Sequence, residues 1–201
     1  AVRSMLGQDY PGLELVAVDD RSTDGTGEIL DRLAAEDSRL RVVHVSELPP
    51  GWLGKTHALQ TAADAADSEW ILFADGDVWL AQGALRRAVS QACARGDDHL
   101  AVIPEVPTES IGERLMMAVF SPALYVNSSV WDVDNPDSRA YLGVGAFNLV
   151  RAEAFRAIGS FRNLALSVDD DLRLGEALKA SGRRSRALVG TGAVRVRWHV
   201  G

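Results

Sequence analysis

The sequence has little of several features, and each shortage excludes a class of protein. Its 201 residues contain one cysteine, Cys93, so an internal disulfide framework is excluded. Seven prolines and 18 glycines are too few for a low-complexity or collagen-like chain. No apolar run approaches the ~20 residues that a membrane-spanning helix needs. Positive charge is in deficit: 21 Lys and Arg against 28 Asp and Glu give a net charge of −7, which argues against a nucleic-acid partner.

What remains is the composition of an ordinary globular protein, with 47% hydrophobic and 24% charged residues. In the first half, short apolar segments alternate with segments of helical periodicity. The expected strands are 13–18, 41–45, 70–74 and 100–103, and the expected helices are 25–36, 56–66 and 84–94. This alternation predicts an α/β fold with a mostly parallel sheet and helices on both faces.

The second half is less regular. The segment 111–126 is long and apolar, it has helical character, and Pro122 interrupts it. After it we expect a polar loop at 127–139, helices at 153–158 and 172–180, and a strand at 193–198. With no repeat and no flexible linker, the chain is expected to form one domain, 1–201, with a sheet-forming half, 1–105, and an irregular half, 106–201.

Carboxylates follow two of the expected strands. Asp19 and Asp20 come after 13–18, and Asp75 and Asp77 come after 70–74. In a parallel sheet the carboxyl ends of the strands share one edge, where ligands bind. Two carboxylates separated by one glycine suit a hard cation such as Mg²⁺ or Mn²⁺. The alternative is that Asp-Gly pairs form turns, which is about as probable for a single pair.

Three further motifs are candidates for the site. Asp169–Asp171 opens an expected helix; capping explains an acidic start, but crowding of three carboxylates also raises the pKa of at least one, which suits a general base. Lys55 follows a glycine-rich turn at the start of a helix, where it faces either an anionic ligand or solvent. Gly143 and Gly145 permit a close approach of the backbone, although the motif alone is weak.

These motifs together resemble the family 2 glycosyltransferases, which have the GT-A fold. The resemblance runs along nearly the whole chain, and its residues are 6–11, 18–26, 54–55, 74–78, 143–151 and 170–171. The turn that includes Gly51 and Lys55 is most similar to the branch of ceramide glucosyltransferases and hopanoid-associated glycosyltransferases. Val194 stands at the first position of a Gln/Arg-x-x-Arg-Trp element, of which Arg197 and Trp198 match.

The resemblance implies an inverting transfer of a sugar from a nucleotide diphosphate to an acceptor hydroxyl. Asp19 and Asp20 would contact the nucleoside, and Lys55 would lie on the nucleotide side. Asp75 and Asp77 would hold the diphosphate and a Mg²⁺ or Mn²⁺ ion. In the second half, Asp170 and Asp171 match the acidic pair that includes the catalytic base, with Asp171 as the base, and Gly143, Gly145, Arg197 and Trp198 would contribute to substrate binding.

The resemblance also bears on what surrounds this domain. The family's first strand and its nucleotide loop are expected before Ala1 and are missing here. Lipid-linked relatives work at the cytoplasmic face of a membrane and continue into transmembrane helices. The segment 111–126 would then lie on the membrane and admit a lipid acceptor, whereas a buried core helix is the more common origin of such a pattern.

Two other functions stay open from the sequence alone. A nucleotidyltransferase that forms sugar nucleotides shares this fold and its acidic metal chemistry, but it needs a glycine-rich basic loop after its first strand. A carbohydrate- or partner-binding domain that has kept the fold without catalysis is the other alternative.

Overall fold

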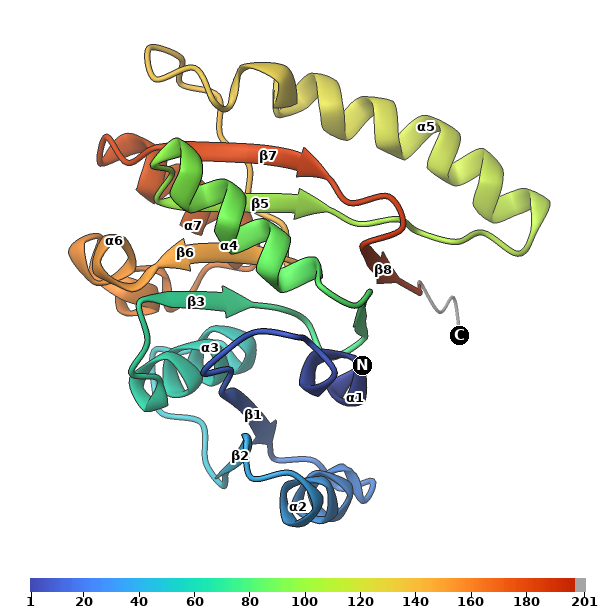
Figure 1. The fold of residues 1–201 in the computed structure, drawn as a ribbon, viewed down its shortest axis with the longest axis vertical. Helices are drawn as coiled ribbons and strands as arrows, with labels where there is room; N and C mark the ends of the chain where they lie inside the picture. Colours follow the sequence, from blue (N-terminus) through green and yellow to red (C-terminus); the bar gives the residue numbers. More distant parts are fainter. Residues whose placement is uncertain (198–201) are drawn as a thin grey trace.

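The computed structural model describes residues 1–197, and a mixed four-stranded sheet forms their centre (Figure 1). In the order of their hydrogen bonding, its strands are β3 (Trp70–Phe73), β6 (Asn148–Arg151), β5 (His99–Ile103) and β7 (Ser185–Val189). Strand β6 is antiparallel to both of its neighbours, and β5 is parallel to β7. Strands β3, β5 and β7 therefore run in one direction and end at the same edge.

The pairing differs from the mostly parallel sheet that the sequence predicts, because β6 was not expected as a strand. The chain reaches β6 from the edge at which β3 ends, where Asp75 donates its main-chain N–H to the Gly145 carbonyl at 2.9 Å. A strand that starts at that edge runs back through the sheet against its neighbours. The strands of the first half keep the common direction that the alternation predicts.

Two smaller sheets flank the centre. Strands β1 (Leu15–Asp20) and β2 (Leu40–Val45) are parallel, and β4 (Val78–Leu80) and β8 (Val194–Val196) are antiparallel. The strand expected at 193–198 is thus confirmed over its central residues, while Trp198 lies outside the described part of the chain. Strands β4 and β7, like β6, were not predicted.

Helices lie on both faces of the central sheet and beside the smaller sheets. They are α1 (Val2–Leu6), α2 (Thr26–Glu36), α3 (Gly54–Ala65), α4 (Ala84–Arg95), α5 (Ile111–Asn127), α6 (Ala152–Ala157) and α7 (Asp170–Ala180), with 3₁₀ turns at Val130–Asp132 and Ser160–Leu164. Helix α4 lies on one face and α7 on the other (Figure 1). Alternate residues of β5 point to opposite faces of the sheet. Leu100 belongs to the hydrophobic core beneath α4, and Ala101 belongs to a second hydrophobic cluster with Leu142.

Helix α5 corrects the more common interpretation of its sequence, since none of its residues is buried. Its apolar side chains at every fourth position, Ile111, Leu115 and Val119, are 84%, 69% and 68% exposed. Only near its C-terminal end do Leu124 and Tyr125 pack partly on the core. The helix extends along the margin of the central sheet (Figure 1). Within residues 1–197, no helix is both long and apolar enough to span a bilayer.

Candidate active site

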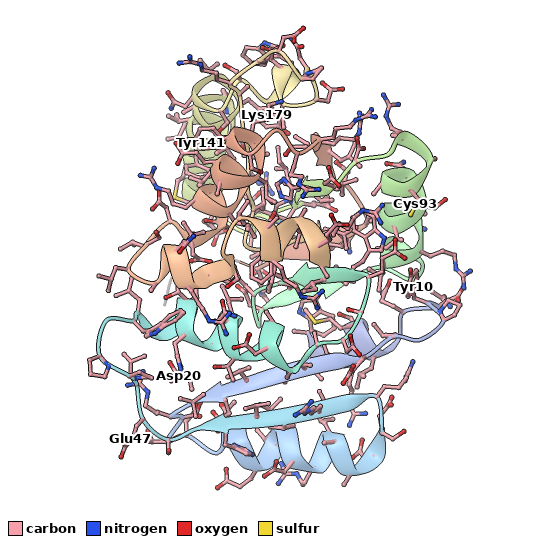
Figure 2. The ribbon with its side chains drawn as sticks, turned by 90° about the vertical axis from the view of Figure 1, so that its left-hand side faces the viewer. Tyr10, Asp20, Glu47, Cys93, Tyr141 and Lys179 are labelled. Carbon is pink, nitrogen blue, oxygen red and sulfur yellow. The ribbon has the colours of Figure 1, made fainter. Side chains whose placement is uncertain are left out.

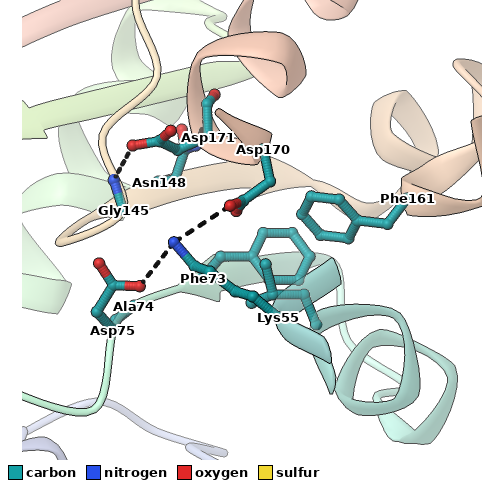
Figure 3. A pocket seen from close by; sticks show the side chains of 10 residues that line it. Lys55, Phe73, Ala74, Asp75, Gly145, Asn148, Phe161, Asp170 and Asp171 are labelled. Atoms are coloured by element: carbon teal, nitrogen blue, oxygen red, sulfur yellow. Dashed lines mark hydrogen bonds and ion pairs between the residues drawn. The ribbon is translucent and has the colours of Figure 1, made fainter. Parts of the chain in front are cut away.

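Three charged side chains from different elements meet in a pocket at the edge where β3 ends (Figure 3). Lys55 comes from the first turn of α3, Asp75 follows β3, and Asp170 begins α7. The Lys55 Nζ lies 3.1 Å from Asp75 Oδ1 and 3.2 Å from Asp170 Oδ1. The Asp170 side chain is 4% exposed, whereas those of Lys55 and Asp75 are half-exposed. One ammonium group therefore joins a carboxylate from each half of the chain.

Burial and charge act in opposite directions on this trio. Burial raises the pKa of Asp170 above its usual value, the Lys55 ammonium opposes the rise, and the Asp171 carboxylate adds to it. For Lys55, burial works to lower the pKa, but the two carboxylates outweigh it and the pKa is raised. The sequence predicted a raised pKa from crowding of carboxylates; the rise is found at Asp170, and burial is its main cause.

Asp171 points into the same pocket and is held by main-chain donors. The Gly145 N–H donates to its Oδ2 at 2.7 Å, and the Leu172 N–H donates to its Oδ1 at 2.9 Å. Its neighbour in the acidic run, Asp169, instead pairs with Arg173 at 3.2 Å. The three adjacent carboxylates thus have three different partners, and two of them face the pocket.

The two glycines expected at the site lie where no side chain fits. A Cβ added to Gly145 would stand 2.5 Å from Asp75 Oδ2, and one added to Gly143 would stand 1.6 Å from the Asp171 carbonyl oxygen. The backbone of this segment therefore packs directly against both acidic motifs, which places Gly145 between Asp75 and Asp171.

The remaining carboxylates of the first half lie beside the pocket. Asp77 is exposed and has no ion pair among the described residues. Asp20 accepts two hydrogen bonds from Arg21, at 2.8 and 3.0 Å, and a Cβ on Gly54 would stand 2.6 Å from its Oδ2. Asp20 thus lies against the start of α3, immediately before Lys55. Figure 2 shows it at the edge where β1 ends.

Asp19 has a different setting from Asp20. Its Oδ2 lies 3.1 Å from His44 Nδ1, and the other ring nitrogen of His44 lies 2.9 Å from Asp31. Hydrogen bonds from Ser22 and His44 lower the pKa of Asp19, and the two carboxylates raise the pKa of His44. Asp19 is therefore a buried carboxylate near the C-terminal end of β1, paired with His44.

Arg197, from the Arg-Trp element near the end of the sequence, does not line the pocket. The Arg197 guanidinium forms an ion pair with Glu109 and is largely exposed. Its neighbour Trp198 lies outside the described residues. The resemblance places both at the substrate, and this placement stays a prediction.

The pocket also contains residues to which the sequence analysis assigned no role. These are Leu59, Phe73, Ala74, Asn148 and Phe161. Asn148 is 1% exposed, and its side-chain amide donates to the Asp171 carbonyl at 3.4 Å. An asparagine within a short apolar segment carries no catalytic pattern, so only its position in β6 reveals it.

Comparison with known proteins identifies the class to which this fold and site belong. The model of the family described as "Glycosyl transferase family 2" matches residues 1–158, and the chain therefore belongs to this family. The chain is 36% identical over 76 residues to the glycosyltransferase GlyG of Streptococcus pneumoniae, which covers 38% of the chain and 24% of GlyG. It is 29% identical over 92 residues to the GalNAc(5)-diNAcBac-PP-undecaprenol beta-1,3-glucosyltransferase of Campylobacter jejuni, or 46% of the chain and 29% of that enzyme.

Solved structures show the same GT-A fold. The mannosyltransferase PcManGT of Pyrobaculum calidifontis, in complex with GDP-Man and Mn²⁺, superposes with a TM-score of 0.74 at 23% identity, over 100% of this chain and 52% of that one. TarS of S. aureus, in complex with UDP-GlcNAc, gives 0.67 at 16% identity, over 100% and 54%. The chain thus spans about half the length of these two structures and about a quarter of the two curated relatives.

Proposed function

We propose that this domain transfers a sugar, with inversion, from a nucleotide-diphosphate sugar to an acceptor hydroxyl. The observation that carries the proposal is the convergence of Asp75, Lys55 and Asp171 at one edge of the sheet, since this pocket joins the two acidic motifs of the family. Residues 1–105 would supply most of the donor side and residues 106–201 most of the acceptor side.

Asp171 is the proposed general base. Two main-chain N–H groups orient its carboxylate, and each oxygen keeps a lone pair free for a further hydrogen bond. A fixed carboxylate in a partly closed pocket can take the proton of the acceptor hydroxyl as that oxygen attacks the anomeric carbon. Asp170 lies deeper and pairs with Lys55, so its role is to fix the start of α7 and the position of the Lys55 ammonium.

Asp75 and Asp77 fit a hard divalent cation, Mg²⁺ or Mn²⁺. Their oxygens are of the type such cations prefer, and Asp77 is exposed. In the described part of the chain, no three Asp, Glu, His or Cys side chains form a metal-binding group. The other ligands would therefore be diphosphate oxygens and water. When bound, the cation would neutralise the charge of the leaving diphosphate.

The proposal for the donor is supported by the residues at the end of β1 and by the solved structures of similar fold. Asp19 and Asp20 lie where β1 ends, beside the start of α3, and would contact the nucleoside. Lys55 links that helix to Asp75 and is placed to meet the diphosphate. PcManGT with GDP-Man and TarS with UDP-GlcNAc support a sugar attached to a nucleoside diphosphate as the donor.

For the acceptor, we propose a lipid-linked hydroxyl at a membrane surface, on its cytoplasmic side. The name of the Campylobacter relative includes a PP-undecaprenol acceptor, which supports a lipid carrier. Helix α5 adds an observation from this chain, because Ile111, Leu115 and Val119 present apolar surface to solvent. Such a face gains free energy when it lies in the interfacial region of a bilayer.

Two substitutions in the full-length protein test the catalytic assignment. Asp171→Asn removes the proton acceptor while it keeps the shape of the side chain, so the transfer rate should fall by about 10²- to 10⁴-fold. Binding of GDP and UDP with Mn²⁺, measured by calorimetry, should stay within about twofold of the parent value. Asp77→Ala should instead abolish the metal-dependent part of nucleotide binding.

Asp169→Asn is the matched control, because this neighbouring carboxylate pairs with Arg173 at the surface and should not affect transfer. Transfer at the parent rate by Asp171→Asn would show that the base is elsewhere. If the parent bound no nucleotide and transferred no sugar from any of a panel of UDP- and GDP-sugars, a non-catalytic binding domain would be favoured. Release of diphosphate from a nucleoside triphosphate and a sugar 1-phosphate would favour a nucleotidyltransferase.

A further inference from the structure

A buried polar chain crosses three strands of the central sheet behind the pocket. His99 of β5 lies between Ser185 of β7 and Asn148 of β6. The His99 Nε2 is 2.5 Å from Asn148 Oδ1, and its Nδ1 is 3.3 Å from Ser185 Oγ. The three residues are 0%, 1% and 3% exposed. Burial of polar groups at this depth is costly unless each finds a partner, and here each does.

The direction of each hydrogen bond follows from the last link. The Asn148 Nδ2 donates to the Asp171 carbonyl, so its Oδ1 must face His99 and accept. His99 Nε2 therefore carries the proton, and Nδ1 accepts from the Ser185 hydroxyl. Burial, which lowers the pKa of His99 to about 4, keeps the ring neutral, as this pattern requires. This series of hydrogen bonds therefore has one consistent set of donors and acceptors, and it ends at the main-chain carbonyl of Asp171.

Asp171 is held at two points by one short segment. The Gly145 N–H holds its carboxylate, and the Asn148 amide holds its main-chain carbonyl. Gly143, just before them, packs its backbone against the same carbonyl, where a Cβ would be 1.6 Å away. The hydrogen bond from the Asn148 side chain thus joins strand β6 to the first turn of helix α7.

We propose that Asn148 is a positioning residue for Asp171, and that His99 and Ser185 fix the orientation of its amide. The inference rests on the proposed function, in which Asp171 is the base. Asn148 does not touch the reacting atoms; it sets where the Asp171 peptide lies, and so where the carboxylate points. A displacement of about 1 Å at a base costs up to about 100-fold in rate, so a single hydrogen bond at this place affects the transfer.

Asn148→Leu in the full-length protein removes the link at nearly constant volume. We expect kcat for transfer to fall by about 10- to 100-fold, while binding of GDP and UDP with Mn²⁺ stays within about twofold. Hydrogen exchange gives a second readout that needs no donor or acceptor. The Gly145 amide proton, which bonds to the Asp171 carboxylate, should exchange at least about tenfold faster in Asn148→Leu.

The second link is tested at His99. His99→Gln keeps an N–H donor and should retain most of the parent kcat, whereas His99→Leu should lose as much as Asn148→Leu. The double variant should be no slower than either single leucine variant, because both act through one link. Gln60→Met is the matched control: Gln60 is equally buried, at 4% exposed, and bonds to Asp64 on its own helix.

Three results would overturn the inference. One is a parent-like kcat and Gly145 exchange in Asn148→Leu. Another is an equal loss in Gln60→Met, and the third is a joint loss of nucleotide binding and kcat, which would indicate general damage. If the parent transferred no sugar, the proposed function would fail, and the exchange of the Gly145 amide would still decide whether Asn148 holds the Asp171 peptide.

Discussion

At the scale of single residues, Gly143 leaves almost no room for a side chain beside the start of α7. Its backbone lies where a Cβ would stand 1.6 Å from the Asp171 carbonyl oxygen and 3.0 Å from the Leu172 nitrogen. Those atoms belong to the first turn of α7, which has no freedom to retreat without moving Asp170 away from Lys55. The glycine is needed for contact and not for an unusual backbone angle.

Gly143→Ala should therefore lower the free energy of unfolding by about 1–3 kcal/mol, as other overpacked sites do. Urea denaturation followed by circular dichroism measures the change. Gly76→Ala is the control, because a Cβ at Gly76 meets nothing within 4 Å, and its effect should stay within about 0.5 kcal/mol. Equal stability of Gly143→Ala and the parent would show that the segment can move away from α7.

Much of the pocket follows from the sequence at this scale. The rule that parallel strands end at one edge predicts where Asp75 lies. Local motifs single out Lys55 and the run Asp169–Asp171, and the family resemblance selects Asp171 within that run. The rule does not predict that Lys55 bridges to Asp170, because the angle at which α7 meets the sheet depends on packing. Asn148 was assigned no role for a related reason: its partners, His99 and Asp171, come from other elements and leave no local pattern.

At the scale of elements, α5 differs most from its neighbours. The helix has a capping box, in which Ser110 and Glu113 exchange hydrogen bonds, yet it buries no residue. Local capping thus defines its start, and its apolar face is left to solvent. An apolar helix is usually a core helix, and the sequence alone does not show that the sheet beneath is already covered by α7 on one face and α4 on the other.

If the exposed face of α5 lies on a bilayer, charges placed there should weaken the contact. Leu115→Asp with Val119→Asp should reduce binding to phosphatidylcholine–phosphatidylglycerol vesicles by at least about tenfold, because each apolar side chain contributes roughly 1.5–3 kcal/mol when buried. Sedimentation with vesicles measures the bound fraction, and circular dichroism checks that the fold is kept.

Ile29→Asp is the control for this measurement. Ile29 is also an exposed apolar residue, at 49%, but it lies on α2. Vesicle binding should be unchanged by this substitution. An equal loss from Ile29→Asp, or parent-like binding by the α5 double variant, would remove α5 from the membrane contact.

The strands that were not predicted, β4, β6 and β7, lack a clear local signal. Strand β4 has three residues, too few to show a period. Strand β7 contains Arg186, whose guanidinium pairs with the buried Asp97 at 2.7 Å, so a charge stands where a core strand should be apolar. Strand β6 begins with Asn148, which is buried through its hydrogen bonds. In each case a long-range contact overrides the local signal.

At the scale of the whole molecule, buried His99 links stability to pH. Its pKa is lowered to about 4 by burial, against a usual value of 6.5. Between these values the unfolded chain binds the proton and the folded protein does not. The free energy of unfolding therefore falls as the pH falls from 6.5 to 4, by up to about 3 kcal/mol from this residue, and is unaffected above pH 7.

Urea denaturation at pH 7, 5.5 and 4 tests this dependence. Carboxylates also lose favourable interactions in acid, so the parent is compared with His99→Gln, which has no group that titrates in this range. The difference in the free energy of unfolding between the parent and His99→Gln should become smaller as the pH falls from 7 to 4. Parallel pH profiles would mean that the pKa of His99 is the same in the folded and the unfolded protein.

The ion pairs of Lys55 have a consequence for how the protein is made. The chain is synthesised from its N-terminus, and Asp170 emerges 115 residues after Lys55. Until then Lys55 has only Asp75 as a partner, and the bond from the Gly145 N–H to Asp171 cannot form. The β1–β2 pair and its helix come from nearby residues, whereas the pocket is completed only when α7 reaches the sheet. A nascent chain that ends before α7 thus has Asp75 and Lys55 but lacks Asp171, the proposed base.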